Sequence, residues 1–217
     1  MITVEQVAVN LAAVRERIKN VGGQHAVDNV SIIAVTKTLP IEVARLAADV
    51  GCNALGENYA QELLDKYTNE QPLPIHFIGH LQSNKVKQIA PLVVLWQTVD
   101  RKSIAKEIRK HSPRAKVLLQ VNVSGESHKS GCGPQEMPAL LDHCVAEGLV
   151  VLGLMTMAPL QGGLVAAGNT FRSLRRLADH YGLADCSMGM SGDFEVAVSE
   201  GATIIRLGSV LFGQRLD

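Results

Sequence analysis

The chain has 217 residues, which is enough for one sizeable hydrophobic core and short for two. Its 21 Lys and Arg residues balance 21 Asp and Glu residues, so no net field attracts nucleic acid, an anionic membrane or a polyanionic substrate, and we expect neither a nucleic-acid nor a membrane partner. The four cysteines include no CxxC pair, which is typical of a reduced, cytoplasmic protein.

The N-terminal stretch is charged throughout and amphipathic, which predicts a helix from about Val4 to Asn20 and argues against a signal peptide. The uncharged run from Gly148 to Phe171 is long enough to suggest a membrane span, but Pro159 and a glycine pair interrupt it. A buried strand, a loop and a helix start explain this run better. His128 and Cys132 are close in sequence, but they lack a second ligand pair, so we expect no metal site.

From the first strand onward, short β-branched or apolar runs alternate with longer helical patterns, as in parallel βα units. Eight strands are predicted, at Ser31–Thr36, Asn53–Leu55, Ile75–Ile78, Leu95–Val99, Lys116–Val123, Val150–Met155, Cys186–Met188 and Thr203–Leu207. Helices are predicted between them, at Ile41–Val50, Glu57–Tyr67, Ser83–Ile89, Lys102–Lys110, Pro134–Glu147 and Gly168–His180.

No linker or charge run separates these units, which favours an α/β fold with one domain over residues 1–217, a (β/α)₈ barrel of the TIM type with an extra N-terminal helix. An open, doubly wound sheet is the alternative. It loses its best support because no GxGxxG motif follows the first strand.

Lys37 is the first candidate, because reactive residues of such barrels gather where the strands end. It directly follows the apolar run IIAVT, so its ammonium is expected at the barrel rim. A partly desolvated lysine there can attack an aldehyde. On position alone, a rim lysine that extends into water is an equally good interpretation.

Arg206 lies within the apolar last strand, where an unpaired charge would be costly. Because the last strand of a closed barrel pairs with the first, side-chain alternation is expected to bring Arg206 into the mouth beside Lys37. An arginine there suits the pyridine nitrogen of pyridoxal 5′-phosphate (PLP). A structural ion pair with an inner carboxylate such as Glu57 is the alternative.

Two loops near the C-terminus have the composition of a phosphate site. The segments SMGMSGDFE and RLGSVLFG supply small residues, hydroxyls and the N–H groups of helix starts. Ser191, Gly208 and Ser209 are therefore expected to bind an anion, at the place where barrels commonly hold phosphate. Ordinary turn chemistry, with Asp193 as the acid of a helix start, is the alternative.

Asn58 and His80 follow other strands and are candidates to line the ring, and Tyr59 is a candidate proton carrier. A rim role without ligand contact suits His80 better. With these residues in view, the chain resembles the pyridoxal phosphate homeostasis protein family, whose fold is like the N-terminal barrel of alanine racemase. The resemblance covers about Ile32 to Gln214 and is carried by AVTK, LGENYAQE, HFIGHLQSNK, QVNVSGESHKSG, GLMTMAP, SMGMSGDFE and GATIIRLGSVLFG.

This resemblance implies a PLP Schiff base on Lys37, with Arg206 near the pyridine nitrogen. The cofactor-binding residues that it implies are Lys37, Asn58, Ser187, Met188, Ser191, Arg206, Gly208 and Ser209. It also implies a monomeric PLP-binding protein of vitamin B6 and amino-acid homeostasis, with no established reaction of its own and with PLP-dependent apo-enzymes as partners.

Two other functions stay open from the sequence. A PLP-dependent amino-acid racemase needs a proton donor on each face of the substrate carbon, and only Tyr59, Tyr67 and Tyr181 are available as phenols. A Schiff-base aldolase without cofactor would explain Lys37. It would not explain two phosphate-type loops, unless its substrate is a sugar phosphate.

Overall fold

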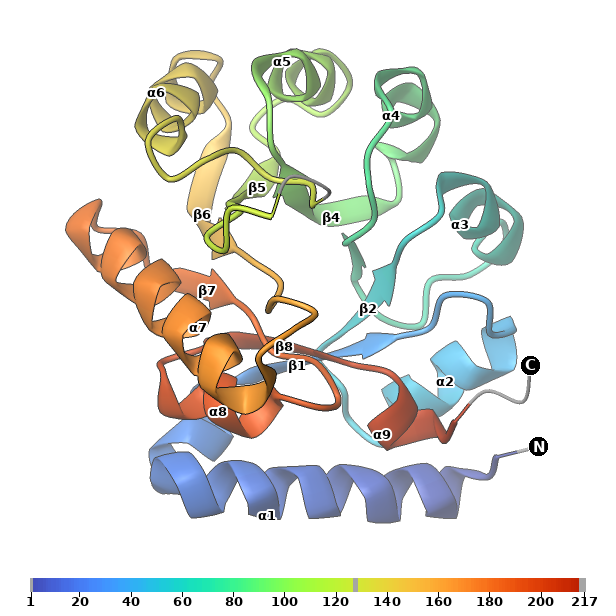
Figure 1. The fold of residues 1–217 in the computed structure, drawn as a ribbon. Helices are drawn as coiled ribbons and strands as arrows, with labels where there is room; N and C mark the ends of the chain where they lie inside the picture. The colour runs from blue at the N-terminus through green and yellow to red at the C-terminus, as the bar shows by residue number, and fades with distance from the viewer. Residues whose placement is uncertain (1, 127–128, 215–217) are drawn as a thin grey trace.

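The barrel is closed. A computed structural model describes residues 2–126 and 129–214, so His128 of the metal hypothesis lies outside the described residues. Eight parallel strands pair in chain order, and the last pairs with the first. Helices form an outer ring around them (Figure 1). This topology confirms the (β/α)₈ expectation and excludes the open sheet.

The strands are β1 Ser31–Val35, β2 Ala54–Glu57, β3 Ile75–Phe77, β4 Val93–Val99, β5 Lys116–Gln120, β6 Val150–Met155, β7 Asp185–Ser187 and β8 Ile204–Leu207. The helices are α1 Val4–Asn29, α2 Ile41–Asp49, α3 Ala60–Lys66, α4 Ser83–Ile89, α5 Lys102–His111, α6 Met137–Ala146, α7 Gly163–His180, α8 Phe194–Ser199 and α9 Ser209–Phe212.

Some limits differ from the sequence prediction. The sequence predicts a helix that begins at Glu57, whereas this residue ends β2 and α3 begins only at Ala60. Every residue of β2 is buried, so Glu57 continues the strand into the barrel wall. The helix predicted from Gly168 begins earlier, because Gly162 adopts a left-handed conformation (φ 91°) that serves as its N-cap.

The N-terminal helix is also longer than predicted, since α1 extends to Asn29. Gly23 (φ 69°, ψ −175°) breaks the helical geometry within it, which allows a further helical turn after the kink. In Figure 1, α1 lies along the lower edge of the picture, on the outside of the barrel beside α8 and α9. Arg17 fastens it there, with a guanidinium nitrogen 2.6 Å from Glu195 and its guanidinium carbon 4.4 Å from the ring centre of Phe194.

Two hydrophobic clusters build the core. The larger lies between the strands and the surrounding helices. The smaller fills the lower part of the barrel with one side chain from each of six strands: Ile33, Ala54, Leu95, Leu118, Met155 and Ile204. Because this cluster fills its part of the interior, the space for a ligand within the described barrel lies at the C-terminal ends of the strands.

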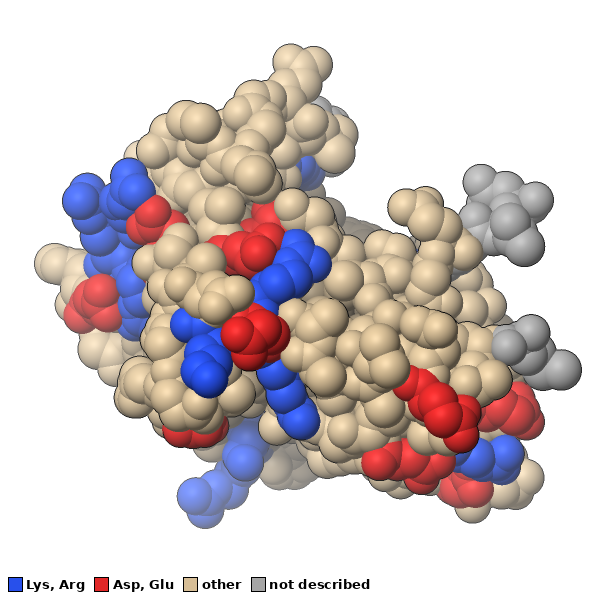
Figure 2. Space-filling model, turned by 90° about the horizontal axis from the view of Figure 1, so that it is seen from below, with Lys and Arg blue, Asp and Glu red and all other residues tan. Residues whose placement is uncertain are grey.

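The surface agrees with the balanced composition. Figure 2 shows the face that α1 covers, where basic and acidic side chains lie close to one another. The uncharged run from Gly148 to Phe171 forms β6, a loop and the start of α7, as predicted. None of the helices in the described ranges is long and apolar enough to cross a bilayer.

Candidate cofactor-binding site

A cavity of about 560 Å³ lies at the C-terminal ends of the strands, within the size range of small-molecule sites. It brings together six of the residues singled out in the sequence, namely Lys37, Asn58, Ser191, Arg206, Gly208 and Ser209. The rest of its wall is largely apolar, with Val35, Ile78, Met157 and Phe212. The cavity therefore combines an amine, a guanidinium and a hydroxyl-bearing loop around an apolar wall.

Strand alternation places Lys37 and Arg206 on the same inner side. Ile33 of β1 is in register with Arg206 of β8, and Ile33 belongs to the cluster inside the barrel. Val35 and Lys37 follow Ile33 at intervals of two residues, so their side chains also face inward. Val35 and Lys37 both line the cavity, and so does Arg206.

The residues on both sides of Lys37 donate hydrogen bonds to carboxylates. The Thr36 hydroxyl donates to Glu57 Oε1 at 2.7 Å, and the Thr38 N–H donates to Glu62 Oε1 at 2.5 Å. Thr38 has a φ of 61°, a left-handed conformation that is uncommon for a β-branched residue. These two hydrogen bonds hold the chain in the sharp turn that directs Lys37 into the mouth.

A buried cluster supports this turn. Lys66 Nζ lies 2.9 Å from Glu57 Oε1 and 2.8 Å from Glu62 Oε1, and it donates to the Thr36 carbonyl at 2.7 Å. The Tyr67 hydroxyl donates to Glu57 Oε1 at 2.8 Å. Burial, together with the neighbouring Glu57 carboxylate, raises the pKa of Tyr67 well above its usual range.

This cluster decides whether Glu57 forms an ion pair with Arg206. Glu57 is fully buried beside Lys66, and among the described residues it makes no ion pair with Arg206. The structural ion pair considered for these two residues is therefore wrong. Since Glu57 ends β2 on the side of α3, its carboxylate lies behind the barrel wall rather than in the mouth.

Arg206 is buried and is held by neutral acceptors. Its Nη1 donates to Ser187 Oγ at 2.7 Å, and its Nη2 donates to the Thr156 carbonyl at 3.0 Å. Burial lowers the pKa of Arg206 to about 10, although Asp193 acts in the opposite direction, so the guanidinium stays protonated at neutral pH. Within the described residues it forms no salt bridge. A buried cation of this kind favours an acceptor supplied by a ligand.

The two C-terminal loops meet at Ser191. Its hydroxyl oxygen accepts the N–H groups of Gly208, at 3.2 Å, and of Val210, at 3.3 Å. A Cβ atom added at Gly192, beside it, would meet nothing within 4 Å. Asp193 accepts the N–H of Met190 at 2.6 Å and makes no capping hydrogen bond to α8. Because its oxygen accepts both N–H groups, the Ser191 hydroxyl proton is left to donate to an anion, and open space lies beside it, which suits a phosphate.

The remaining predicted residues lie in different places. The Asn58 Oδ1 atom is buried without a hydrogen-bond partner, so it can accept from a bound molecule. Ser187 lies directly beneath Arg206. Met188 is fully buried in the cluster between the strands and the helices, and the structure does not bring its side chain to the cavity. Tyr59 is 54% exposed, and His80 is exposed with Ser130 as a neighbour at 3.4 Å.

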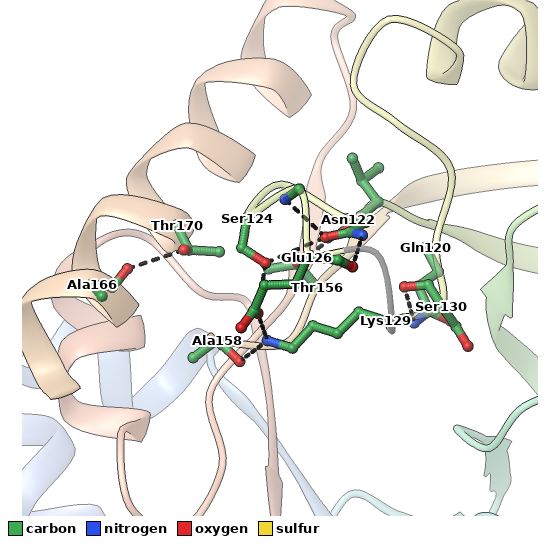
Figure 3. Close-up of polar contacts among 12 residues, drawn as sticks. Gln120, Asn122, Ser124, Glu126, Lys129, Ser130, Thr156, Ala158, Ala166 and Thr170 are labelled. Atoms are coloured by element: carbon green, nitrogen blue, oxygen red, sulfur yellow. Dashed lines mark hydrogen bonds and ion pairs between the residues drawn. The ribbon is translucent and has the colours of Figure 1, made fainter. Parts of the chain in front are cut away.

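Part of the apolar wall was not identified from the sequence. Met157 belongs to it, and its signal was available, since it follows Met155 of the inner cluster by two residues. A hydrogen bond between two loops stabilises this part of the rim (Figure 3). Lys129 Nζ donates to the carbonyl of Ala158, the neighbour of Met157, at 2.6 Å, and it lies 2.5 Å from Glu126 Oε2.

Comparisons with known proteins show to which class this barrel belongs. The family model described as "Alanine racemase, N-terminal domain" matches residues 9–216. Relatives named pyridoxal phosphate homeostasis protein match most of the chain. The one from Aquifex aeolicus is 42% identical over 197 residues, covering 85% of this chain and 86% of the relative, and the one from Homo sapiens is 36% identical over 234 residues, covering 94% and 85%.

The chain belongs to the pyridoxal phosphate homeostasis protein family, within the class of alanine racemase N-terminal barrels. The solved structure of PipY from Synechococcus elongatus with PLP bound is similar to it, with a TM-score of 0.81 and 30% identity over 95% of this chain and 100% of that one. Alanine racemase of Clostridium difficile shares the fold at 17% identity, with a TM-score of 0.72 over 98% of this chain and 58% of the racemase. These matches confirm the family resemblance seen in the sequence.

Proposed function

We propose that the protein binds PLP in this cavity, holds it as a Schiff base on Lys37 and takes part in intracellular PLP and amino-acid homeostasis. The observation that carries the proposal is the meeting of Lys37, Arg206 and the Ser191 loop around one apolar cavity of about 560 Å³. The similarity to PipY, whose structure has PLP bound, supports it.

The residues present fit this cofactor on three counts. The cavity wall contains an acceptor without a partner, Asn58 Oδ1, which suits a donor on the ligand. The Ser191 hydroxyl, which keeps its own proton to donate, suits the phosphate together with Gly208 and Ser209 of the cavity wall. Arg206, which can only donate, suits the unprotonated pyridine nitrogen.

When bound, PLP supplies an electrophilic aldehyde and an electron-withdrawing ring. Lys37 supplies the amine, and the turn held by Thr36 and Thr38 aims it into the mouth. Arg206 would donate a hydrogen bond to the ring nitrogen while keeping its proton, so that nitrogen would stay unprotonated and the ring would be a weaker electron sink.

This arrangement favours a carrier over a racemase. Of the three tyrosines that could donate a proton, Tyr67 is buried against Glu57, and Tyr59 and Tyr181 are outside the described cavity wall. The relatives are named homeostasis proteins rather than enzymes. We infer a single-domain, monomeric carrier that releases PLP to apo-enzymes in the reducing cytoplasm. The four free, buried cysteines support that compartment.

The deciding experiment is reduction with borohydride after incubation with PLP, followed by peptide mapping by mass spectrometry. We expect the added mass on the peptide that contains Lys37. The Lys37→Ala variant should lose it and keep weaker, non-covalent binding through the phosphate loops. Lys102→Ala, which removes an exposed lysine at the start of α5, is the matched control and should behave as wild type. Attachment at another lysine, or none, would disprove the proposal.

Carrier and racemase are then separated by two assays on the loaded protein. We expect transfer of PLP to an apo-enzyme and no racemisation of alanine. Racemisation at an enzyme-like rate would refute the carrier function while leaving the binding site intact.

A further inference from the structure

A chain of four polar side chains crosses the barrel interior beneath the cavity. Arg206 of β8 donates to Ser187 Oγ of β7 at 2.7 Å, and the Ser187 hydroxyl donates to Gln97 Oε1 of β4 at 2.6 Å. Gln97 Nε2 then lies 2.9 Å from His76 Nδ1 of β3. Ser187 and Gln97 are fully buried. Four strands are thereby linked directly under the guanidinium.

The chemistry of Arg206 dictates the direction of every bond in this chain. A guanidinium has only donors, so Ser187 Oγ must accept from Arg206 and must send its own proton elsewhere. Gln97 Oε1 is the acceptor that receives it. The amide nitrogen of Gln97 then faces His76, which fixes His76 Nδ1 as an acceptor and the ring proton on Nε2.

The chain is also neutral apart from Arg206. None of its other three members is a carboxylate, and Arg206 forms no salt bridge within residues 2–126 and 129–214. The guanidinium is thus held without a salt bridge, although the carboxylate of Asp193 acts on it electrostatically. Its second hydrogen bond also goes to a neutral acceptor, because Nη2 donates to the backbone carbonyl of Thr156, which is labelled in Figure 3.

We propose that Gln97 is a positioning residue that acts through Ser187: it holds Arg206 by a one-way chain of neutral acceptors, so that a guanidinium without a salt bridge faces the ring nitrogen of the cofactor. This inference rests on the proposed binding of PLP in the cavity. Gln97 sets the electronic environment of the ring without touching it.

Two substitutions of Gln97 test this chain of hydrogen bonds. Gln97→Leu removes the acceptor for Ser187. Gln97→Glu keeps the shape but replaces the amide nitrogen by an oxygen that can only accept, and it adds a negative charge behind Arg206. Thr98→Val is the matched control, because Thr98 is the next residue of β4 and donates to the Gly79 carbonyl rather than to the chain.

The first measurement uses the protein without PLP. Nitrogen NMR of the His76 ring is expected to show the proton on Nε2 in wild type and in Thr98→Val. In Gln97→Glu the carboxylate accepts from Nδ1, so the proton should move to that nitrogen. A wild-type protein with the proton on Nδ1 would overturn the proposed direction of the chain.

The second measurement uses the protein loaded with PLP. We expect the absorption maximum of bound PLP to shift in both Gln97 variants, and its release to become about tenfold faster, which corresponds to about 1.4 kcal/mol. Unchanged spectra and release rates in both variants, with wild type loading normally, would overturn this inference alone. An equal change in Thr98→Val would overturn it too, as general loosening of the barrel. A wild-type protein that takes up no PLP would instead refute the proposed function.

Discussion

Acidification is expected to destabilise this protein through His76. Burial lowers the pKa of His76 from 6.5 to about 4. Between these values the unfolded chain binds a proton that the folded protein does not, so stability is complete above the unfolded pKa and falls as the pH decreases. Because a tenfold change in proton affinity corresponds to about 1.36 kcal/mol, a pKa lowered from 6.5 to about 4 gives a loss of about 3 kcal/mol by pH 4.

A loss of this size is a large part of the stability of an ordinary domain, so it is measurable by urea unfolding. The test compares wild type with His76→Gln between about pH 4 and pH 7. Glutamine keeps an acceptor for the Gln97 amide but cannot titrate. Subtracting the two curves removes the contribution of the carboxylates, which are common to both proteins, and should leave a difference that grows by about 3 kcal/mol across this range.

The control is His25→Gln, which makes the same substitution at an exposed histidine of α1. If His76→Gln and wild type lose stability in parallel as the pH falls, then His76 is not held neutral in the folded protein.

Four further outcomes are expected. Lys66→Met should destabilise the fold by about 3–5 kcal/mol, measured by urea unfolding, because it leaves Glu57 buried without its cation, and the double variant with Glu57→Gln should recover much of this loss. Thr38→Asn should raise stability by about 1 kcal/mol in the same assay, since asparagine tolerates a φ of 61° better, and a decrease would argue against strain at this turn. Gly192→Val should leave stability within about 0.5 kcal/mol of wild type but weaken PLP binding in a titration, because it fills space beside the phosphate loop; unchanged affinity would place the phosphate elsewhere. Arg206→Gln should change the absorption of bound PLP, and an identical spectrum would mean that the guanidinium does not face the ring.

Much of this site could be predicted because it depends on two local regularities. Alternation along β1 and β8 puts Lys37 and Arg206 on the inner side, and a closed parallel barrel brings all strand ends to one face. The loop around Ser191 carries its own signal in small residues and hydroxyls. The same alternation would have identified Met157, had it been applied beyond the end of β6.

Element limits were harder to predict, because local preference and tertiary pairing compete there. Glu57 is a good helix former followed by a helical pattern, yet pairing with β3 extends β2 to include it. The sequence predicts a loop up to Gly168, although Gly162 is the N-cap from which α7 begins.

The sequence by itself determined the barrel, the rim position of Lys37 and the two loops suited to phosphate, since each follows from the periodicity or composition of a short segment. The tertiary structure alone decided the partners of the buried polar groups. Lys66 neutralises Glu57 behind the barrel wall, and Gln97 is joined to Arg206 through Ser187. Such pairs join residues from different strands, and which polar groups meet across a barrel depends on strand register and on how neighbouring side chains fill the interior, which no single segment encodes.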